Sequence, residues 1–399
     1  MYPTKNSLAS QRSLVFITAE YPFSKQETFI ENEISFLAEA FDQIIVLPKN
    51  TPGTARTMPP SCRLGRPYGE TSATIGKHLL WKEWLQVKGH VGKSKVAYRS
   101  WQGINKRLTQ INASTKDIAG EITYYSYWLD EGAMAAAHLG QRDGQTSICR
   151  AHGWDVYSTR HPHDYLPFRA FLAHSELIVC PISNHGMGAL RDQGFSKLEL
   201  FYLGTRPPKN TDMGQTQQNQ GKKRLVSVSS IIDLKRVQRI AQIFVQLRKS
   251  DNQWQWHHFG DGPLEEDLKQ WLQTKGVENY HLHGRQPNEA VRDWLNTNHG
   301  NTLFINQSTT EGLPVSMMEA MSYGIPCVGT NVGGVSEIID HGNNGILHGV
   351  DQDTDAVARS IENLSTERLN AMSKNAKKTW ENLFNAEKNY TTFINALMA

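Results

Sequence analysis

Residues 302–339, TLFINQSTTEGLPVSMMEAMSYGIPCVGTNVGGVSEII, decide the fold that we predict for this chain. The apolar run Thr302–Asn306 predicts a strand, and a polar loop containing Glu311 connects it to a helix predicted at Pro314–Tyr323. Proline suits the first helical position, where a missing N–H costs nothing, and Gly324 suits the end of the helix. The helix therefore begins at the carboxyl end of a parallel strand, which is where open α/β sheets bind ligands.

Two carboxylates lie near the start of this predicted helix. Glu311 precedes it and Glu319 lies inside it. The free N–H groups and the dipole of a helix N-terminus favour an anion or a hydroxyl-rich group. Two carboxylates in these positions would hold two parts of one elongated ligand. The alternative is that Glu311 only caps the helix and Glu319 is a surface residue, and the spacing alone does not separate the two interpretations.

The same alternation of strands and helices runs through the rest of the chain. We predict strands at Leu14–Thr18, Gln43–Leu47, Thr123–Tyr127, Ser147–Ala151, Leu177–Pro181, Leu198–Leu203, Arg224–Ser229, Gln255–Phe259, Tyr280–Leu282, Pro326–Gly329 and Ile346–His348, with helices such as Gln238–Arg248, Leu264–Lys275 and Glu289–Asn296 between them. Mostly uninterrupted apolar strands are typical of parallel sheets that are covered on both faces. The chain is thus predicted to have an α/β fold with two doubly wound, Rossmann-like domains.

Length and composition agree with two domains. The 399 residues exceed the roughly 250–300 that one hydrophobic core supports. The stretch 206–223 is polar and rich in Gln and Asn, which is typical of a linker. We therefore predict a linker at 206–223 between a domain at 1–205 and a domain at 224–376. Hydrophobic residues make up 39% and charged residues 20%, which excludes a disordered chain.

Charge and cysteine content exclude several other classes of protein. A formal net charge of +3 disfavours a nucleic-acid-binding protein. The 4 cysteines are scattered without a CxxC pair, which argues against a zinc knuckle or a disulfide framework and favours a reducing compartment. No run approaches the ~20 apolar residues of a spanning helix, and the start of the chain does not resemble a secretion signal, so we expect a cytoplasmic protein.

One basic segment suggests a surface for membranes. Between Lys77 and Arg107 the chain has eight Lys or Arg residues and one acid, Glu83, with Trp81, Trp84 and other apolar residues interleaved. Such a stretch is suited to peripheral contact with an anionic membrane surface. A solvated, partly helical insertion is the equally weighted alternative.

The stretch E-G-L-P-V-S-M-M-E-A-M, followed by G-G-x-x-E, resembles the E(x7)E signature of the retaining GT-B glycosyltransferases of family 4. Val228–Val237, Phe259–Leu264 and Leu282–Arg285 are similar to other segments of that family, and Tyr125–Leu129 and Arg150–Tyr157 to its polysaccharide-building subgroup. The resemblance implies a GT-B fold, with an acceptor-binding domain first and a nucleotide-sugar domain second. It also implies that a C-terminal helix, at about 377–399, packs back on the first domain.

The resemblance assigns roles at the donor site. Glu311 matches the glutamate that contacts the transferred sugar, Glu319 the one that holds the ribose hydroxyls, and Lys235 the lysine on the diphosphate, where a fixed cation stabilises the developing charge. The remaining expected donor-binding residues are Ser230, Arg236, Gly260, Gly262, Arg285, Gly312, Leu313, Val315, Gly333 and Gly334. The glycines are equally compatible with plain turns.

The chain departs from the family where Ser229-Ser230 replaces the usual Gly-Arg, so that one diphosphate cation is missing. Arg236 is our candidate to replace that cation, and without such a replacement catalytic activity itself is in doubt.

His152 is the main candidate in the first half, because it follows a predicted strand and matches the family's histidine near the reacting sugar. Arg150, Asp155 and Trp128 are expected beside it on the acceptor side. Histidine here suits hydrogen bonding to the sugar or acceptor. Tyr125, Tyr127 and Trp128 would stack on sugar faces, although aromatic residues that alternate on a strand are more often part of the core.

These expectations combine into a reaction. The resemblance implies transfer of a sugar from a nucleoside-diphosphate sugar to a hydroxyl of a glycan or lipid-linked acceptor in surface polysaccharide biosynthesis, with no metal and no cofactor beyond the donor. We expect this at the inner face of the cytoplasmic membrane. A nucleotide-sugar epimerase and a non-catalytic saccharide-binding scaffold of the same fold remain the alternatives, and the serine at position 230 supports the second.

Overall fold

The computed structural model describes residues 11–23, 27–69, 71–208 and 222–398. Contacts divide the chain into two compact units. Unit 1 extends to Phe201 and takes in the chain again from Tyr390, and unit 2 is Tyr202–Asn389. Most of the linker expected at 206–223, namely residues 209–221, lies outside the described residues.

Unit 1 contains a sheet of six parallel strands. They are β1 (Arg12–Thr18), β2 (Gln43–Pro48), β3 (Cys62–Leu64), β4 (Glu121–Ser126), β5 (Ser147–Ala151) and β6 (Ile178–Pro181). Their order across the sheet is β3-β2-β1-β4-β5-β6. The chain therefore reverses its direction of winding between β1 and β4, and in a doubly wound sheet this switch point is where ligands bind.

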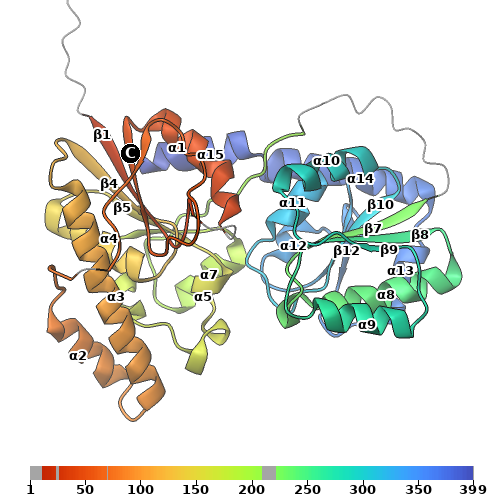
Figure 1. Cartoon of the computed structure of the whole chain (residues 1–399), viewed down its shortest axis with the longest axis horizontal. Helices are drawn as coiled ribbons and strands as arrows, with labels where there is room; N and C mark the ends of the chain where they lie inside the picture. Colours follow the sequence, from red (N-terminus) through yellow and green to blue (C-terminus); the bar gives the residue numbers. More distant parts are fainter. Residues whose placement is uncertain (1–10, 24–26, 70, 209–221, 399) are drawn as a thin grey trace, which may run out of the picture. The chain divides into compact units, whose positions relative to one another are not determined.

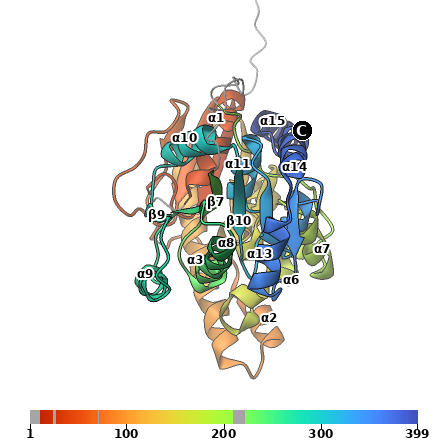
Figure 2. The ribbon, with the colours of Figure 1, turned by 90° about the vertical axis from the view of Figure 1, so that its right-hand side faces the viewer.

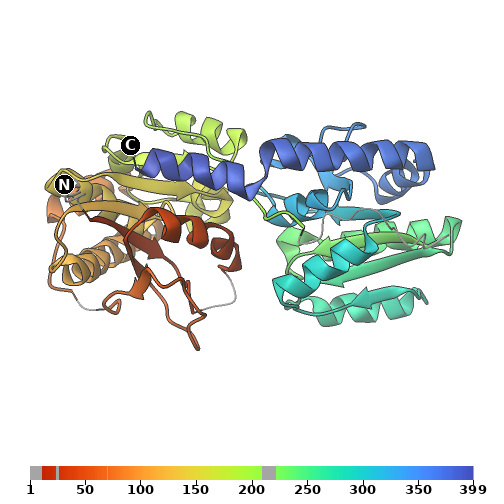
Figure 3. The same cartoon turned by 90° about the horizontal axis from the view of Figure 1, so that it is seen from above.

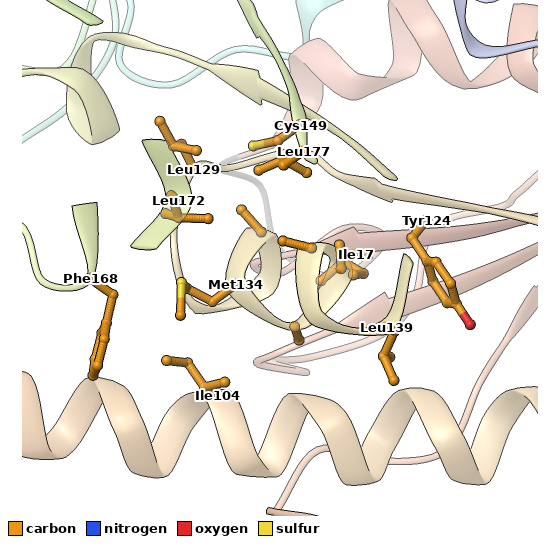
Figure 4. Close-up of a cluster of buried hydrophobic side chains, with 14 of the residues drawn as sticks. Ile17, Ile104, Tyr124, Leu129, Met134, Leu139, Cys149, Phe168, Leu172 and Leu177 are labelled. Atoms are coloured by element: carbon orange, nitrogen blue, oxygen red, sulfur yellow. The ribbon is translucent and has the colours of Figure 1, made fainter. Parts of the chain in front are cut away.

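Helices cover both faces of this sheet. They are α1 (Glu31–Ala40), α2 (Lys77–Gln86), α3 (Val91–Thr115), α4 (Glu131–Asp143), α5 (Gly153–Val156), α6 (Arg169–Ala173), α7 (Asn184–Asp192) and α15 (Ala386–Leu397). On one face, residues of α3 and α4 such as Ile104 and Met134 form a dry core with Phe168 and Leu172 (Figure 4). On the other face, α15 lies beside α1 (Figures 1 and 3), and its Phe393 packs in the same cluster as Ile34.

Unit 2 repeats this architecture. Its parallel strands are β7 (Lys223–Val228), β8 (Trp254–Phe259), β9 (Tyr280–Leu282), β10 (Thr302–Asn306), β11 (Cys327–Thr330) and β12 (Gly345–His348), and their order is β12-β11-β10-β7-β8-β9. Helices α8 (Val237–Ser250), α9 (Glu265–Thr274) and α13 (Thr354–Glu362) cover one face, while α10 (Asn288–Asn298), α11 (Val315–Ser322) and α14 (Thr366–Leu383) cover the other (Figures 1 and 2). The switch point here lies between β7 and β10.

Three details differ from the predicted elements. Leu198–Leu203 is not a strand, because only Leu198 forms a bridge, to Val179 at the edge of the sheet. The short edge strand β3 was not predicted. The C-terminal helix is interrupted: α14 ends at Leu383, and Asn385 accepts a hydrogen bond from the backbone N–H of Glu387 in the first turn of α15.

Candidate active site

The loops that follow β7 and β10 meet at the switch point of unit 2. The first loop ends in a single 3-10 turn, Asp233–Lys235, immediately before α8. The second loop follows β10 and contains Glu311, before α11 begins at Val315. Lys235 Nζ lies 2.6 Å from Glu311 Oε1, so the two residues form an ion pair. The fold thus joins two of the residues that the sequence placed at one site.

Glu311 is held as a carboxylate by three donors. Its residue is only 6% exposed, and Oε1 also accepts hydrogen bonds from Asn306 Nδ2 at 3.0 Å and Ser308 Oγ at 2.6 Å. Burial by itself raises the pKa of a carboxyl group, but the charge of Lys235 and the three hydrogen bonds outweigh it, so the pKa of Glu311 is lowered. Asn306 and Ser308 were not predicted as site residues, although their positions at the end of the strand were a usable signal.

Two glycine pairs allow the loops to approach one another. Gly333 has a φ of 52°, and a Cβ there would lie 1.9 Å from the carbonyl oxygen of Glu311. Gly334 N–H donates to the carbonyl of Gly312 at 2.9 Å. A Cβ on Gly260 would likewise lie 1.9 Å from a backbone carbonyl oxygen of the loop after β7, and a Cβ on Gly262 would lie 2.4 Å from another carbonyl oxygen of the same loop. These glycines therefore shape the loops through backbone packing.

Glu319 lies on α11 and is also largely buried, at 8% exposure. Its Oε1 accepts a hydrogen bond from Asn288 Nδ2, at the first residue of α10, at 3.1 Å. Burial raises the pKa of Glu319, and Asn288 and Arg292 only partly oppose that increase. The pKa values of the two motif glutamates are therefore shifted in opposite directions, because only Glu311 has a direct ion pair.

Arg236 uses its guanidinium elsewhere. It adopts the left-handed conformation with φ 46° at the N-cap of α8. Its Nε donates to the carbonyl of Gln307 at 2.6 Å, and Nη2 donates to the carbonyl of Val350 at 2.8 Å. In this arrangement Arg236 connects the loops after β10 and β12, and its role as the replacement cation for the diphosphate stays a prediction. Ser230 and Arg285 are both exposed, Leu313 is buried, and Val315 is the first residue of α11.

At the carboxyl end of β5 in unit 1, His152 has an aromatic environment. Its ring centroid lies 4.8 Å from that of Tyr127 and 4.7 Å from that of Trp128. Among the described residues, neither buried ring nitrogen has a hydrogen-bond partner, and the nearest polar group is Asp155 Oδ2, 3.9 Å from Nδ1. Leaving such groups unpaired is costly, so a ligand that supplies a partner would be favoured.

The neighbours of His152 connect loops. Asp155 is buried; its Oδ1 accepts a hydrogen bond from the backbone N–H of His152, and its Oδ2 accepts one from the backbone N–H of Leu129 at 2.7 Å. Trp128 Nε1 donates to Glu27 Oε1 at 2.6 Å. The Glu27 carboxylate also accepts hydrogen bonds from the backbone after β1, which joins the two loops at the switch point of unit 1. Glu27 was not predicted to have this function.

Arg150 lies in the core rather than on an acceptor surface. It is 0% exposed, its Nε donates to Glu33 Oε2 and to the hydroxyl of Tyr125, each at 3.1 Å, and its guanidinium lies 3.8 Å from the ring centroid of Phe393. The expectation that Arg150 contacts an acceptor therefore fails for this structure, because a buried carboxylate and helix α15 occupy its side chain.

Unit 1 also contains a cavity of about 730 Å³ beside α3, at the start of α4. It is lined by cations, acids and aromatic rings, among them Lys49, Arg99, Lys106, Arg169, Asp130, Glu131, Trp128 and Trp154. Burial raises the pKa of Asp130 to about 7, and the neighbouring Glu131 carboxylate adds to this effect. A cavity with several cations and exposed aromatic rings is suited to an anionic or saccharide ligand.

Comparison with known proteins gives a family for part of the chain. Residues 208–379 match the family model described as Glycosyl transferases group 1. N-acetyl-alpha-D-glucosaminyl L-malate synthase of Bacillus anthracis is 31% identical over 183 residues, which cover 44% of this chain and 46% of that protein. The chain thus spans less than half of that relative.

Two further similarities extend over nearly the whole chain. The putative colanic acid biosynthesis glycosyltransferase WcaL of Escherichia coli K12 is 24% identical over 425 residues, which cover 93% of this chain and 96% of WcaL. The structure of Anabaena HepE in complex with UDP matches with a TM-score of 0.69 and 14% identity, over 97% of this chain and 99% of that one. At that identity the structural likeness concerns the fold.

Proposed function

We infer that this chain is a glycosyltransferase with the GT-B fold, and we propose that it moves a sugar from a nucleoside diphosphate to a hydroxyl of a glycan or lipid-linked acceptor. The proposal includes retention of anomeric configuration, as in family 4, independence of metal ions, and a role in surface polysaccharide biosynthesis at the inner face of the cytoplasmic membrane. The name of WcaL supports the polysaccharide role. The observation that carries the proposal is the Lys235–Glu311 pair at the switch point of unit 2.

The reaction breaks the bond between the anomeric carbon and the diphosphate oxygen, and the electron pair stays on that oxygen. Lys235, whose side chain is 25% exposed, is the cation for the resulting negative charge. A diphosphate competes with Glu311 for this ammonium group, and stabilising it more strongly as the bond breaks lowers the barrier. The acceptor oxygen then bonds to the same face of the sugar, and its proton passes to the leaving phosphate.

We propose that Glu311 positions the sugar rather than attacking it. Three donors converge on Oε1, and these hydrogen bonds together with the charge of Lys235 lower the pKa of the carboxyl group. A carboxylate stabilised in this way is a weak nucleophile, and its second oxygen, Oε2, would accept hydrogen bonds from the sugar hydroxyls. Glu319 would accept hydrogen bonds from the ribose hydroxyls, in competition with Asn288.

On the acceptor side, we propose that His152 and the cavity of unit 1 contact the acceptor. The unpaired nitrogens of His152 support hydrogen bonding to a sugar, and stacked rings around it restrict its orientation. The cations of the cavity, including Lys106 and Arg169, support an acceptor that carries negative charge, as a lipid diphosphate does.

The test is a transfer assay with purified protein and a panel of nucleotide sugars, first screened by thermal protection. Glu311→Gln and Lys235→Gln should each lower transfer by more than 100-fold, since each removes a group that acts on the reacting centre. The matched control is the double variant Lys269→Gln/Glu265→Gln, which removes an ion pair of 2.7 Å on the surface of the same unit. This variant should leave transfer unchanged. Wild-type turnover by Glu311→Gln would exclude the assignment.

A non-catalytic scaffold is the second candidate, because Ser230 stands in place of the usual arginine and Arg236, our candidate to replace it, is bonded to two backbone carbonyls. A scaffold need not bind a nucleoside diphosphate, so binding measured by calorimetry would favour the transferase. Incubation of the donor alone, followed by analysis of the sugar, separates the transferase from an epimerase.

A further inference from the structure

The basic segment of unit 1 forms a helical hairpin. Helix α2 and the first turns of α3 are antiparallel neighbours joined at 87–90, and they project from the rest of unit 1 (Figures 1 and 2). A shallow groove of about 430 Å³ lies between them, lined by Trp84, His90, Val91 and Tyr98 among others. Among the described residues, no helix is long and apolar enough to cross a membrane.

The outer face of α2 is apolar and basic. Trp81, Trp84 and Leu85 are 60%, 42% and 51% exposed, Lys77 lies on the same face at helical spacing, and the exposed Lys88 follows in the connection 87–90. Soluble proteins rarely expose several large apolar side chains together. This face therefore indicates a surface that is covered when the protein functions.

Helix α3 extends the same surface. Val91 is 70% exposed and Tyr98 is 42% exposed, with Lys95 and Arg99 on the same side of the helix. These two residues and the three on α2 make up five of the nine large hydrophobic residues exposed in the described part of the chain. Their concentration in one hairpin separates this surface from the scattered apolar exposure that any protein has.

The only acid between residues 77 and 100 is turned inward. Glu83 is 5% exposed and accepts hydrogen bonds from the hydroxyl of Tyr165 and from the backbone N–H of Phe168, the latter at 2.9 Å. Glu83 lies together with Leu80 and Val87 on the buried face of the hairpin. The outer face consequently carries several cations with no exposed acid between residues 77 and 100, so it is complementary to a negatively charged partner.

We propose that the outer face of the α2–α3 hairpin docks on an anionic lipid bilayer, with tryptophan rings at the level of the headgroups and lysines against the lipid charges. This combination of exposed aromatic rings and cations without acids is what an interfacial helix requires. A second copy of this chain would present the same cations to itself, which disfavours self-association through this face. The inference concerns binding and does not rest on the proposed reaction.

The first test measures sedimentation of the whole protein with sucrose-loaded vesicles of 70% phosphatidylcholine and 30% phosphatidylglycerol, without sugar donor. Wild type should bind, and raising the salt concentration should release it. Replacing Lys77, Lys88 and Lys95 together by Gln should weaken binding by about 100-fold, at about fivefold for each charge. The control triple replaces exposed lysines of unit 2, Lys275, Lys374 and Lys378, and should bind like wild type.

The second test concerns the apolar contribution. The double variant Trp81→Ser/Leu85→Ser should abolish vesicle binding without lowering Tm, because both side chains are exposed. The control double variant Leu64→Ser/Leu383→Ser, also at exposed positions, should bind vesicles like wild type. Wild type that stays in solution with anionic vesicles would overturn the proposal. So would equal losses in test and control variants, or a wild-type dimer that the hairpin substitutions dissociate, which would assign this face to a second copy.

Discussion

Replacing Lys235 by glutamine should make the stability of the protein depend on pH in a defined direction. In wild type the folded-state pKa of Glu311 is lowered, so its contribution to stability is present above the unfolded pKa of about 4.3 and is lost as the pH falls through the folded value. Without Lys235, burial raises the pKa of Glu311 instead. The buried carboxylate then destabilises the folded state at neutral pH and is relieved of this cost when it becomes protonated.

The size of the effect follows from the geometry. The pair is short at 2.6 Å, and only Lys235, at 25%, has appreciable exposure. A charge-assisted hydrogen bond of this kind contributes about 2 kcal/mol. For a unit of this size, that corresponds to a decrease in Tm of about 4–8 °C at pH 7.5.

Calorimetric scans of wild type and Lys235→Gln from pH 4.5 to pH 8 provide the measurement. The difference in Tm should be largest at pH 7.5–8 and should shrink towards pH 4.5. Lys223→Gln is the control, because both side chains of the Lys223–Asp251 ion pair are partly exposed to solvent. Exposed ion pairs contribute about 0–1 kcal/mol to stability. Equal Tm values for wild type and Lys235→Gln at pH 7.5, or a difference that is constant with pH, would refute the reasoning.

Two further predictions concern loop packing and the core. Gly333→Ala should abolish donor binding, measured by calorimetry with the nucleotide sugar that protects wild type in the thermal screen, because its Cβ would clash with the Glu311 carbonyl; Gly276→Ala has a similar φ of 58° with open space around it and should bind normally. Arg150→Met should lower the free energy of unfolding by about 3–5 kcal/mol in urea titrations, because it leaves the Glu33 carboxylate buried and unpaired. Adding Glu33→Leu should recover most of that loss, and no recovery would contradict this account.

Local sequence patterns predicted most of the strands. The predicted strands Ser147–Ala151, Tyr280–Leu282 and Thr302–Asn306 agree with the structure residue for residue, because each is a short segment bounded by polar residues or turns. The GT-B fold that the motif implied is confirmed. The break at Asn385 was not predicted, because both flanking segments have helical periodicity and only a local hydrogen bond separates them.

The site was predicted in part. Lys235 and Glu311 were assigned to one site and do form a pair, while their roles in catalysis stay a prediction. Arg150 was misplaced because a charged residue near the carboxyl end of a strand resembles a surface group in sequence, and its partner Glu33 is 117 residues away. The hydrogen bonds of Arg236 were not predicted, because the carbonyls that accept them lie 71 and 114 residues further along the chain, while its role toward the diphosphate stays a prediction.

The return of the last helix to unit 1 affects how the protein is made. Phe393, Ile394 and Leu397 complete a core whose other members belong to the first half of the chain. The first domain therefore emerges from the ribosome with an apolar face uncovered. All of unit 2 must be translated before α15 can cover that face. A nascent chain that stalls within unit 2 presents this surface to chaperones, and a premature stop codon near the end would damage the domain that was synthesised first.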